Sequence, residues 1–147
     1  CPVAQELFAT TADAYVILGD LPEDSGTDYT ADGRPATKPY ARARLARMIC
    51  ADSEHFNHRD AVAIAQAVSQ TQTDLLTSAM ERVLQRVNET PRSMVISGHG
   101  EFLAQRAISQ FGLDASVISL RHQLGSLVSR CATAHALAVI AEESTGP

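Results

Sequence analysis

The segment FATTADAY, residues 8–15, places two hydroxyl groups beside a carboxylate. Thr10 and Asp13 share one face of a helix because they are three residues apart, and Thr11 lies between them. Oxygen ligands grouped in this way suit a magnesium–phosphate site. They also suit an ordinary helix start, in which Thr10 or Thr11 caps the first turn. The sequence leaves both interpretations open.

A second group of polar residues follows, in which acidic residues give way to basic ones. The acidic residues are Asp20, Glu23, Asp24, Asp28 and Asp32, and the basic residues are Arg34, Lys38, Arg42, Arg44 and Arg47. Guanidinium groups bind anionic substrates through paired hydrogen bonds, and a carboxylate cluster could hold magnesium. The alternative is a solvated loop and helix face that pair with each other. The segment TADGRP, residues 30–35, favours function because it joins a turn, a carboxylate and a guanidinium.

The third group is SGHGEF, residues 97–102, at a change from apolar residues to a helical pattern. Gly98 and Gly100 allow a tight turn and the close approach of a ligand, and the first amides of a helix attract anions. His99 could bind a phosphate or stack on a base, and Glu101 could bind a ribose hydroxyl, an amine or a magnesium-bound water. The alternative is a plain turn in which Glu101 complements the helix N-terminus. The segment matches neither GxGxxG nor a Walker loop.

The composition limits the class of protein. The 147 residues are 45% hydrophobic with a net charge of −5, which is typical of a globular domain and argues against nonspecific nucleic-acid binding. No apolar run approaches the ~20 residues of a membrane helix, and no signal peptide is evident. Cys1, Cys50 and Cys131 have no metal spacing, so we expect buried free thiols in the cytoplasm. His55 and His58 lack an evident third ligand for zinc.

The hydrophobic pattern predicts one helix-rich α/β domain over residues 1–147. Periodicity and caps predict a helix Gln5–Leu18 ended by Gly19, although residues 16–18 also suit a short strand. A loop of functional length, Asp20–Lys38, is expected to follow. The remaining expected elements are a helix Pro39–Cys50 capped by Thr37, a long helix His58–Asn88 preceded by an Asn57–Asp60 capping pair, a strand Ser93–Ser97, a helix Glu101–Phe111 ended by Gly112, a strand Val117–Leu120 parallel to the first, and a helix Ser129–Glu143.

Four segments together resemble one family. They are ELFATTADAYVILGDLPED, TADGRPATKPYARARLARMICAD, MVISGHGEFLA and LGSLVSRCATAHALAVIAE. The chain is similar to the C-terminal part of the hydantoinase/oxoprolinase-like proteins of the tetrahydromethanopterin-linked one-carbon transfer pathway. The resemblance covers essentially all of the chain, and FATTADAY and TADGRP are its most specific segments.

The resemblance implies the fold of the actin, sugar-kinase and heat-shock-chaperone superfamily, of which this chain would be the C-terminal, ribonuclease-H-like half. It places Gly98, His99, Gly100 and Glu101 at a nucleotide- or phosphate-binding turn. The phosphate loop of the first half is absent, and the chain opens on Cys1 and not on methionine. We therefore expect a processed chain, an expressed segment or the back part of a two-domain protein, which associates with its missing N-terminal half or with a second copy.

The resemblance also implies a reaction. Archaeal relatives take part in methanofuran biosynthesis, in which aminomethylfuran diphosphate and glutamyl-tyramine form an ether and release pyrophosphate. On this basis Asp13 and Asp32 are candidates for the base or for magnesium ligands, and Arg34 is a candidate for binding the diphosphate or the glutamyl carboxylate. Thr10, Thr11, Lys38 and Arg42 are candidate substrate-binding residues. The expected enzyme is a cytoplasmic transferase, and the segment alone could lack activity.

Two alternatives stay open. The first is an ATP-dependent kinase or hydrolase of the same superfamily, which would bind adenine near His99. The second is a non-catalytic helical module that binds a partner subunit through an apolar stripe on the long helix.

Overall fold

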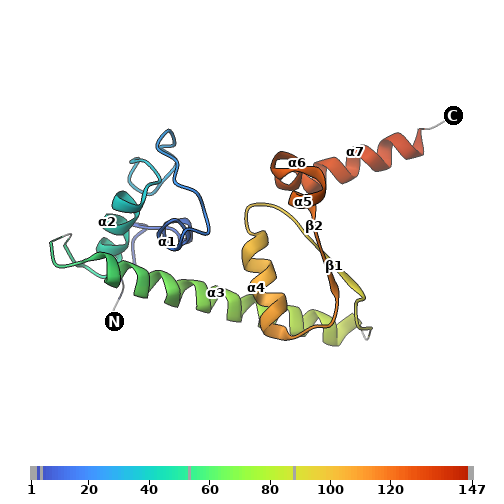
Figure 1. Ribbon diagram of the computed structural model, residues 1–147, viewed down its shortest axis with the longest axis horizontal. Helices are drawn as coiled ribbons and strands as arrows, with labels where there is room; N and C mark the ends of the chain where they lie inside the picture. The colour runs from blue at the N-terminus through green and yellow to red at the C-terminus, as the bar shows by residue number, and fades with distance from the viewer. Residues whose placement is uncertain (1–2, 4, 53, 88, 146–147) are drawn as a thin grey trace. The chain divides into compact units, whose positions relative to one another are not determined.

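The computed structural model describes residue 3 and residues 5–52, 54–87 and 89–145. The chain divides into two compact units, Cys1–Gln72 and Thr73–Pro147. The elements of each unit can be followed by label and colour in Figure 1. The prediction of a helix-rich α/β chain with parallel strands is confirmed, because seven helices and one two-stranded parallel sheet are formed by the described residues.

The first unit is built on three helices, which are α1 (Thr11–Leu18), α2 (Lys38–Met48) and the first part of α3 (His58–Val87). Its apolar core comes from all three and from the α2–α3 loop, and it consists of Ala14, Val16, Ile17, Ala41, Leu45, Ala46, Phe56, Ala61 and Ala65. Burial of this apolar surface is the main stabilising contribution to the unit.

Helix α1 is shorter than predicted. The expected start at Gln5 is wrong, because the Asp13 carboxylate accepts a hydrogen bond of 2.9 Å from the backbone N–H of Thr10 and so fixes the helix start at this point. The predicted end is confirmed, since Gly19 caps the helix in the left-handed conformation with a φ of 81°. Residues 16–18 are helical and do not form a strand.

The segment between α1 and α2 is a loop, as predicted, but it is folded back on itself. Asp24 and Ala36 form an isolated antiparallel bridge, with backbone hydrogen bonds of 2.9 and 3.0 Å. Thr37 is the N-cap of α2, as predicted, and Pro39 lies in its first turn. The predicted end of this helix at Cys50 is wrong by two residues, because Cys50 has a φ of 55° and cannot continue it.

Helix α3 has 30 residues and a length of about 45 Å at 1.5 Å per residue. The predicted capping pair is confirmed, because Asp60 accepts a hydrogen bond from the N–H of Asn57 and Asn57 accepts one from the N–H of Asp60. The helix ends at Val87, and the predicted last residue, Asn88, lies outside the described residues. Its apolar stripe is buried only in part, since exposed members follow at Leu75, Leu76, Val83 and Val87.

The second unit contains the sheet. Strand β1 (Ser93–Ile96) pairs with β2 (Ser116–Ser119) in parallel, with Ser93 opposite Ser116 and Ile96 opposite Ser119. Helix α4 (Glu101–Phe111) connects them, as the strand–helix–strand pattern predicts. Among the described residues of this unit, the buried apolar ones are Ile96, Ala107 and Ile108. The glycine turn therefore follows the carboxyl end of β1.

The C-terminal part differs from the prediction of one helix, Ser129–Glu143. Three helices follow β2, namely α5 (Leu120–Leu124), α6 (Ser126–Arg130) and α7 (Ala132–Ser144). Ser119 ends the second strand one residue early, because its side chain accepts the N–H of His122 and caps α5. Gly125, with a φ of 83°, separates α5 from α6, and Cys131 separates α6 from α7 with φ and ψ of −108° and 27°.

Two expectations concern the chain as a whole. The prediction of buried thiols is wrong for Cys50 and Cys131, which are free and exposed, and Cys1 lies outside the described residues. None of the described helices combines the length and the apolar character that crossing a membrane requires.

Candidate functional site

The first unit is organised around a buried guanidinium. Arg44 on α2 is completely buried and lies between two carboxylates that are far apart in the sequence. Its Nε donates to Asp13 Oδ1 at 2.8 Å, and one of its terminal nitrogens lies 2.6 Å from the same oxygen. The other terminal nitrogen donates to Asp32 Oδ1 at 2.8 Å. The structure thus brings the predicted pair Asp13 and Asp32 together, on the two sides of Arg44.

Asp32 also holds the loop that contains it. Its Oδ1 accepts the backbone N–H of Arg34 at 3.2 Å, and the carbonyl oxygen of Arg34 accepts a hydrogen bond of 2.6 Å from the hydroxyl of Thr30. The same carbonyl lies 3.4 Å from Arg44, which donates to it. The backbone of the TADGRP segment is therefore fixed, while the Arg34 side chain is exposed with its guanidinium over the ring of Tyr40 at 5.8 Å.

These contacts set the ionisation of the cluster. Burial by itself would raise the pKa of Asp32, but hydrogen bonds from Arg44 and from the Arg34 backbone outweigh it and hold that pKa below its ordinary value. Burial by itself would lower the pKa of Arg44, and hydrogen bonds to Asp13 and Asp32 outweigh it and raise that pKa. Asp32 and Arg44 are therefore charged near neutral pH.

The cluster does not fit a bound magnesium ion. Asp13 Oδ1 faces Arg44 and its Oδ2 accepts the Thr10 N–H, so both oxygens are engaged. Asp32 Oδ2 has no hydrogen bond and lies 3.7 Å from a terminal nitrogen of Arg47. One oxygen beside two guanidinium groups is far from the near-octahedral oxygen shell that Mg²⁺ requires. Within the described residues, no group of three or more His, Cys, Asp or Glu side chains could hold a metal ion.

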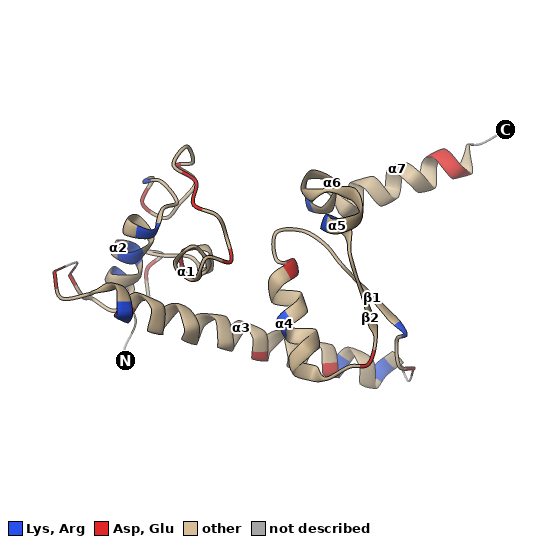
Figure 2. Cartoon of the chain, viewed as in Figure 1, with Lys and Arg blue, Asp and Glu red and all other residues tan. Residues whose placement is uncertain are grey.

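Basic side chains gather on α2, beside the acidic loop that precedes it (Figure 2). The predicted substrate-binding residues Lys38 and Arg42 lie one turn apart and line a small hollow of about 210 Å³ with Pro39 and His58. The side chains of Lys38 and Arg42 form no ion pair within the described part of the chain. They are therefore available to an anionic group.

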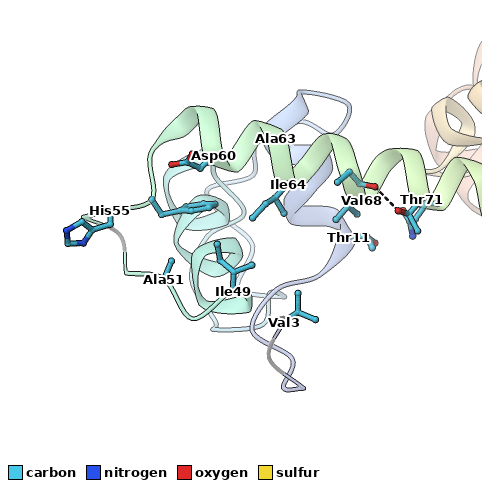
Figure 3. A pocket seen from close by; sticks show the side chains of 13 residues that line it. Val3, Thr11, Ile49, Ala51, His55, Asp60, Ala63, Ile64, Val68 and Thr71 are labelled. Atoms are coloured by element: carbon cyan, nitrogen blue, oxygen red, sulfur yellow. Dashed lines mark hydrogen bonds between the residues drawn. The ribbon is translucent and has the colours of Figure 1, made fainter. Parts of the chain in front are cut away.

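A larger apolar groove of about 820 Å³ opens in the first unit (Figure 3). Its walls come from α3, from the start of α1 and from the α2–α3 loop. The lining residues include Thr11, Ile49, Phe56, Ile64, Ala67 and Val68. The structure thus places the predicted substrate-binding residue Thr11 on the groove wall, whereas Thr10 is the N-cap of α1.

In the second unit, Gly98 has a φ of 90° and Gly100 is the N-cap of α4 with a φ of −92°. His99 is exposed between them. The N–H of Gly98 donates to the hydroxyl of Ser129 at 2.8 Å. That hydroxyl donates in turn to Glu101 Oε1 at 2.6 Å. The hydroxyl of Ser129 on α6 therefore fixes the turn, and His99 and Gly100 are exposed to solvent.

Glu101 is buried and accepts three hydrogen bonds from the protein. Ser119 donates to its Oε2 at 2.5 Å, and Ser129 and the backbone N–H of Arg121 donate to its Oε1. Burial by itself would raise the pKa of Glu101, but these hydrogen bonds outweigh it and hold the pKa below its ordinary value of 4.5. The carboxylate joins the glycine turn to the end of β2 and to α6.

The sequence analysis named Arg44 only as one of five basic residues that could bind an anionic substrate or pair with the acidic loop, and the structure pairs it with Asp32 of that loop. It did not identify Arg44 as buried, nor did it identify Ser119, Ser129 or the groove. Arg44 could have been found, because a helical period places it on the same face as Ala41 and Leu45, where a charged residue needs a buried partner. The two serines and the groove carry no comparable local signal. Which of the predicted residues take part in chemistry stays a prediction.

The profile of the hydantoinase/oxoprolinase family matches residues 3–144 of the chain. This chain belongs to the hydantoinase/oxoprolinase family. The family match covers both units, and so it includes the Arg44 cluster, the groove and the glycine turn.

Two curated relatives give a finer comparison. A protein of Methanococcus vannielii is 24% identical over 140 residues, which are 94% of this chain and 62% of the relative. A protein of Methanocaldococcus jannaschii is 26% identical over 141 residues, which are 96% of this chain and 41% of the relative. Both are named as the synthase of a (furan-2-yl)methanamine that carries a γ-L-glutamylaminoethyl group through a phenoxymethyl link. This hydantoinase/oxoprolinase-family chain spans less than two thirds of either relative.

Replacing Arg44 by methionine is expected to lower the free energy of unfolding by about 3–5 kcal/mol, because the buried carboxylate of Asp13 and the partly buried carboxylate of Asp32 lose their counter-ion. Arg47 is the matched control, since it lies on the same helix, contacts the same Asp32 and has a side chain that is 46% exposed. Arg47→Met is expected to cost less than about 1 kcal/mol. Urea denaturation followed by circular dichroism measures both. An equal loss of unfolding free energy in the two variants would contradict the stabilising role described for the buried Arg44.

Acid is expected to destabilise the chain partly through Glu101. Its pKa in the folded state lies below the ordinary value of 4.5, so its stabilising contribution is complete above pH 4.5 and is lost as the pH falls through the folded pKa. Glu101→Gln should lower stability at pH 7 and flatten the decline of stability below pH 4.5. Glu142→Gln, at an exposed position of α7, should keep the decline of the parent chain. Urea titrations over this pH range decide the matter, and an unchanged slope in Glu101→Gln would refute the assignment.

Proposed function

We propose that this chain is part of an enzyme that joins the phenol of glutamyl-tyramine to aminomethylfuran diphosphate. The observation that carries the proposal is the match of 94% and 96% of the chain to two synthases whose named product contains this phenoxymethyl–furan ether. In the balanced step, the phenol oxygen forms a bond to the furan-bound methylene carbon. The bond from that carbon to the diphosphate oxygen breaks, pyrophosphate leaves, and the phenol proton passes to a base.

Of the two candidate bases, Asp32 is the better supported. Its Oδ2 has no hydrogen bond, whereas both oxygens of Asp13 are engaged. The lowered pKa keeps Asp32 ionised, and its buried Oδ2 is proposed to accept the phenol proton when movement of the loop exposes it to the substrate. Asp13 then acts through Arg44, which holds Asp32 in place.

The anionic parts of the substrates need cations. The exposed guanidinium of Arg34 and the hollow lined by Lys38 and Arg42 are proposed to bind the diphosphate or the glutamyl carboxylate. The solvent-facing residues His99 and Gly100 are proposed as further phosphate contacts in the second unit. Binding of magnesium and of ATP stays a prediction.

The proposed fold is the C-terminal, ribonuclease-H-like half of an actin- or sugar-kinase-like protein. The parallel pairing of β1 and β2 around α4 supports it. Because the chain spans 62% and 41% of its two relatives, we propose that activity requires a further part of a longer protein or a second copy of this chain. A cytoplasmic location belongs to the same proposal.

The test uses the complete reading frame that contains this chain, incubated with aminomethylfuran diphosphate and glutamyl-tyramine, with mass spectrometry of the ether and of pyrophosphate. Arg34→Ala should lower kcat/KM at least tenfold, a loss of about 1.4 kcal/mol of transition-state stabilisation. Arg59→Ala, at an exposed arginine in the first turn of α3, should leave it within about twofold.

Two outcomes would contradict the proposal. The first is the absence of ether in the presence of both substrates, together with hydrolysis of added ATP, which would favour the kinase or hydrolase alternative. The second is formation of the ether at the same rate in Arg34→Ala and in the parent protein, which would remove Arg34 from the site.

A further inference from the structure

The groove of the first unit has walls without a cationic side chain. Its thirteen lining residues include no Lys or Arg, and most are apolar. Ala63, Ile64, Ala67 and Val68 contribute successive turns of α3, and Ile49 faces them from the end of α2 (Figure 3). The volume of about 820 Å³ lies in the range of small-molecule sites, roughly 300–1,000 Å³.

The polar groups of the groove are mostly engaged with the protein itself. The hydroxyl of Thr71 donates to the carbonyl of Ala67 at 2.8 Å, and Asp60 accepts the N–H of Asn57 at 2.9 Å. The ring of His55 lies 2.9 Å from Asp52. Within the described residues, the hydroxyl of Thr11 has no hydrogen-bond partner. The groove therefore offers a mainly apolar wall with the Asp60 carboxylate and the Gln72 amide among its polar groups, and with the Thr11 hydroxyl available to a ligand.

We propose that this groove binds the phenol ring of the acceptor substrate, with the Thr11 hydroxyl on the phenol oxygen. The inference rests on the proposed function, because it takes the ring from the phenoxymethyl group in the name of the relatives' product. An uncharged ring with one polar oxygen matches the mainly apolar walls and the available Thr11 hydroxyl. A phosphate does not match them, since no Lys or Arg lines the groove.

The first test measures binding of N-acetyltyramine, a neutral phenol, to the 147-residue chain by ligand-observed NMR. N-ethylacetamide, which lacks the ring, should not bind. Ala67→Trp, which fills the groove, should weaken the binding of N-acetyltyramine at least tenfold. Ala63→Trp, one helical turn earlier on the same wall, should have the same effect. Gln66→Trp is the matched control, because Gln66 is the exposed neighbour on α3 and does not line the groove.

The hydroxyl is tested separately. Thr11→Val removes the hydroxyl and keeps the shape of the side chain. It should weaken the binding of N-acetyltyramine about fivefold. Binding of N-acetylphenethylamine, which lacks the phenol oxygen, should be unchanged. Equal effects on the two ligands, or equal binding by Ala67→Trp and Gln66→Trp, would overturn the proposal.

Other occupants of the groove give a different signal. The chain contains no tryptophan, so each Trp variant carries a single tryptophan that can be excited selectively over the tyrosines. A blue shift of Ala67→Trp emission that grows with protein concentration, with a dimer in sedimentation, would show that a second copy covers the groove and would overturn the proposal.

Failure of the groove assignment can be told apart from failure of the proposed function. If the protein expressed from the complete reading frame makes the ether and Ala67→Trp leaves its KM for glutamyl-tyramine unchanged, the groove assignment fails while the proposed function stands. If the ring binds as described and no ether forms, the proposed function fails instead.

Discussion

The first unit depends on the burial of one charged side chain, Arg44. A guanidinium removed from water is costly, and it is tolerated only where carboxylates of good geometry surround it. Asp13 and Asp32 provide them from α1 and from the loop, so the cluster fixes two segments on α2 at the same time. The apolar core around Leu45 and Ala46 supplies stabilisation, while the cluster determines where α1 and the loop lie.

The second unit contains a related arrangement with a single buried charge. Hydroxyl and amide donors from Ser119, Ser129 and Arg121 compensate the burial of Glu101, and the charge of the Arg121 side chain adds a smaller Coulombic attraction. In both units the buried carboxylates position a turn that faces solvent. The groups left for a substrate are then the exposed ones, above all Arg34, His99 and the Lys38–Arg42 hollow. Buried carboxylates thus fix the backbone, and different, exposed side chains are proposed to bind the substrate. This division is the physical basis of the proposed site.

Local signals in the sequence predicted much of the fold. Caps at Thr37, Asn57 and Gly19, and the strand–helix–strand order around Glu101–Phe111, depend on neighbouring residues and are confirmed. The divided C-terminal helix was not predictable in the same way. Gly125 and Cys131 divide it because their backbone dihedral angles, φ 83° with ψ 164° and φ −108° with ψ 27°, are not helical.

The site was less predictable because it depends on contacts between distant residues. Arg44 meets residues 31 and 12 positions away, and no local pattern specifies such partners. The groove requires the packed arrangement of α1, α3 and the loop before α3. Residue types nevertheless gave useful candidates, since Asp13, Asp32 and Thr11 all lie at these two features. The family resemblance supplied the reaction, which no contact within the chain specifies.

The most direct measurement is amide hydrogen exchange in Asp32→Ala, which removes one carboxylate from Arg44 and leaves the other. The account predicts that the amides of Asp24 and Ala36, which close the loop, exchange at least tenfold faster, about 1.4 kcal/mol of lost protection. The amides of Ala46 and Ala65 in the helical core should keep their rates, because Asp13 still pairs with Arg44. Unchanged exchange at Asp24 and Ala36, or an equal acceleration throughout the unit, would contradict the claim that the buried Arg44 cluster holds the loop in place.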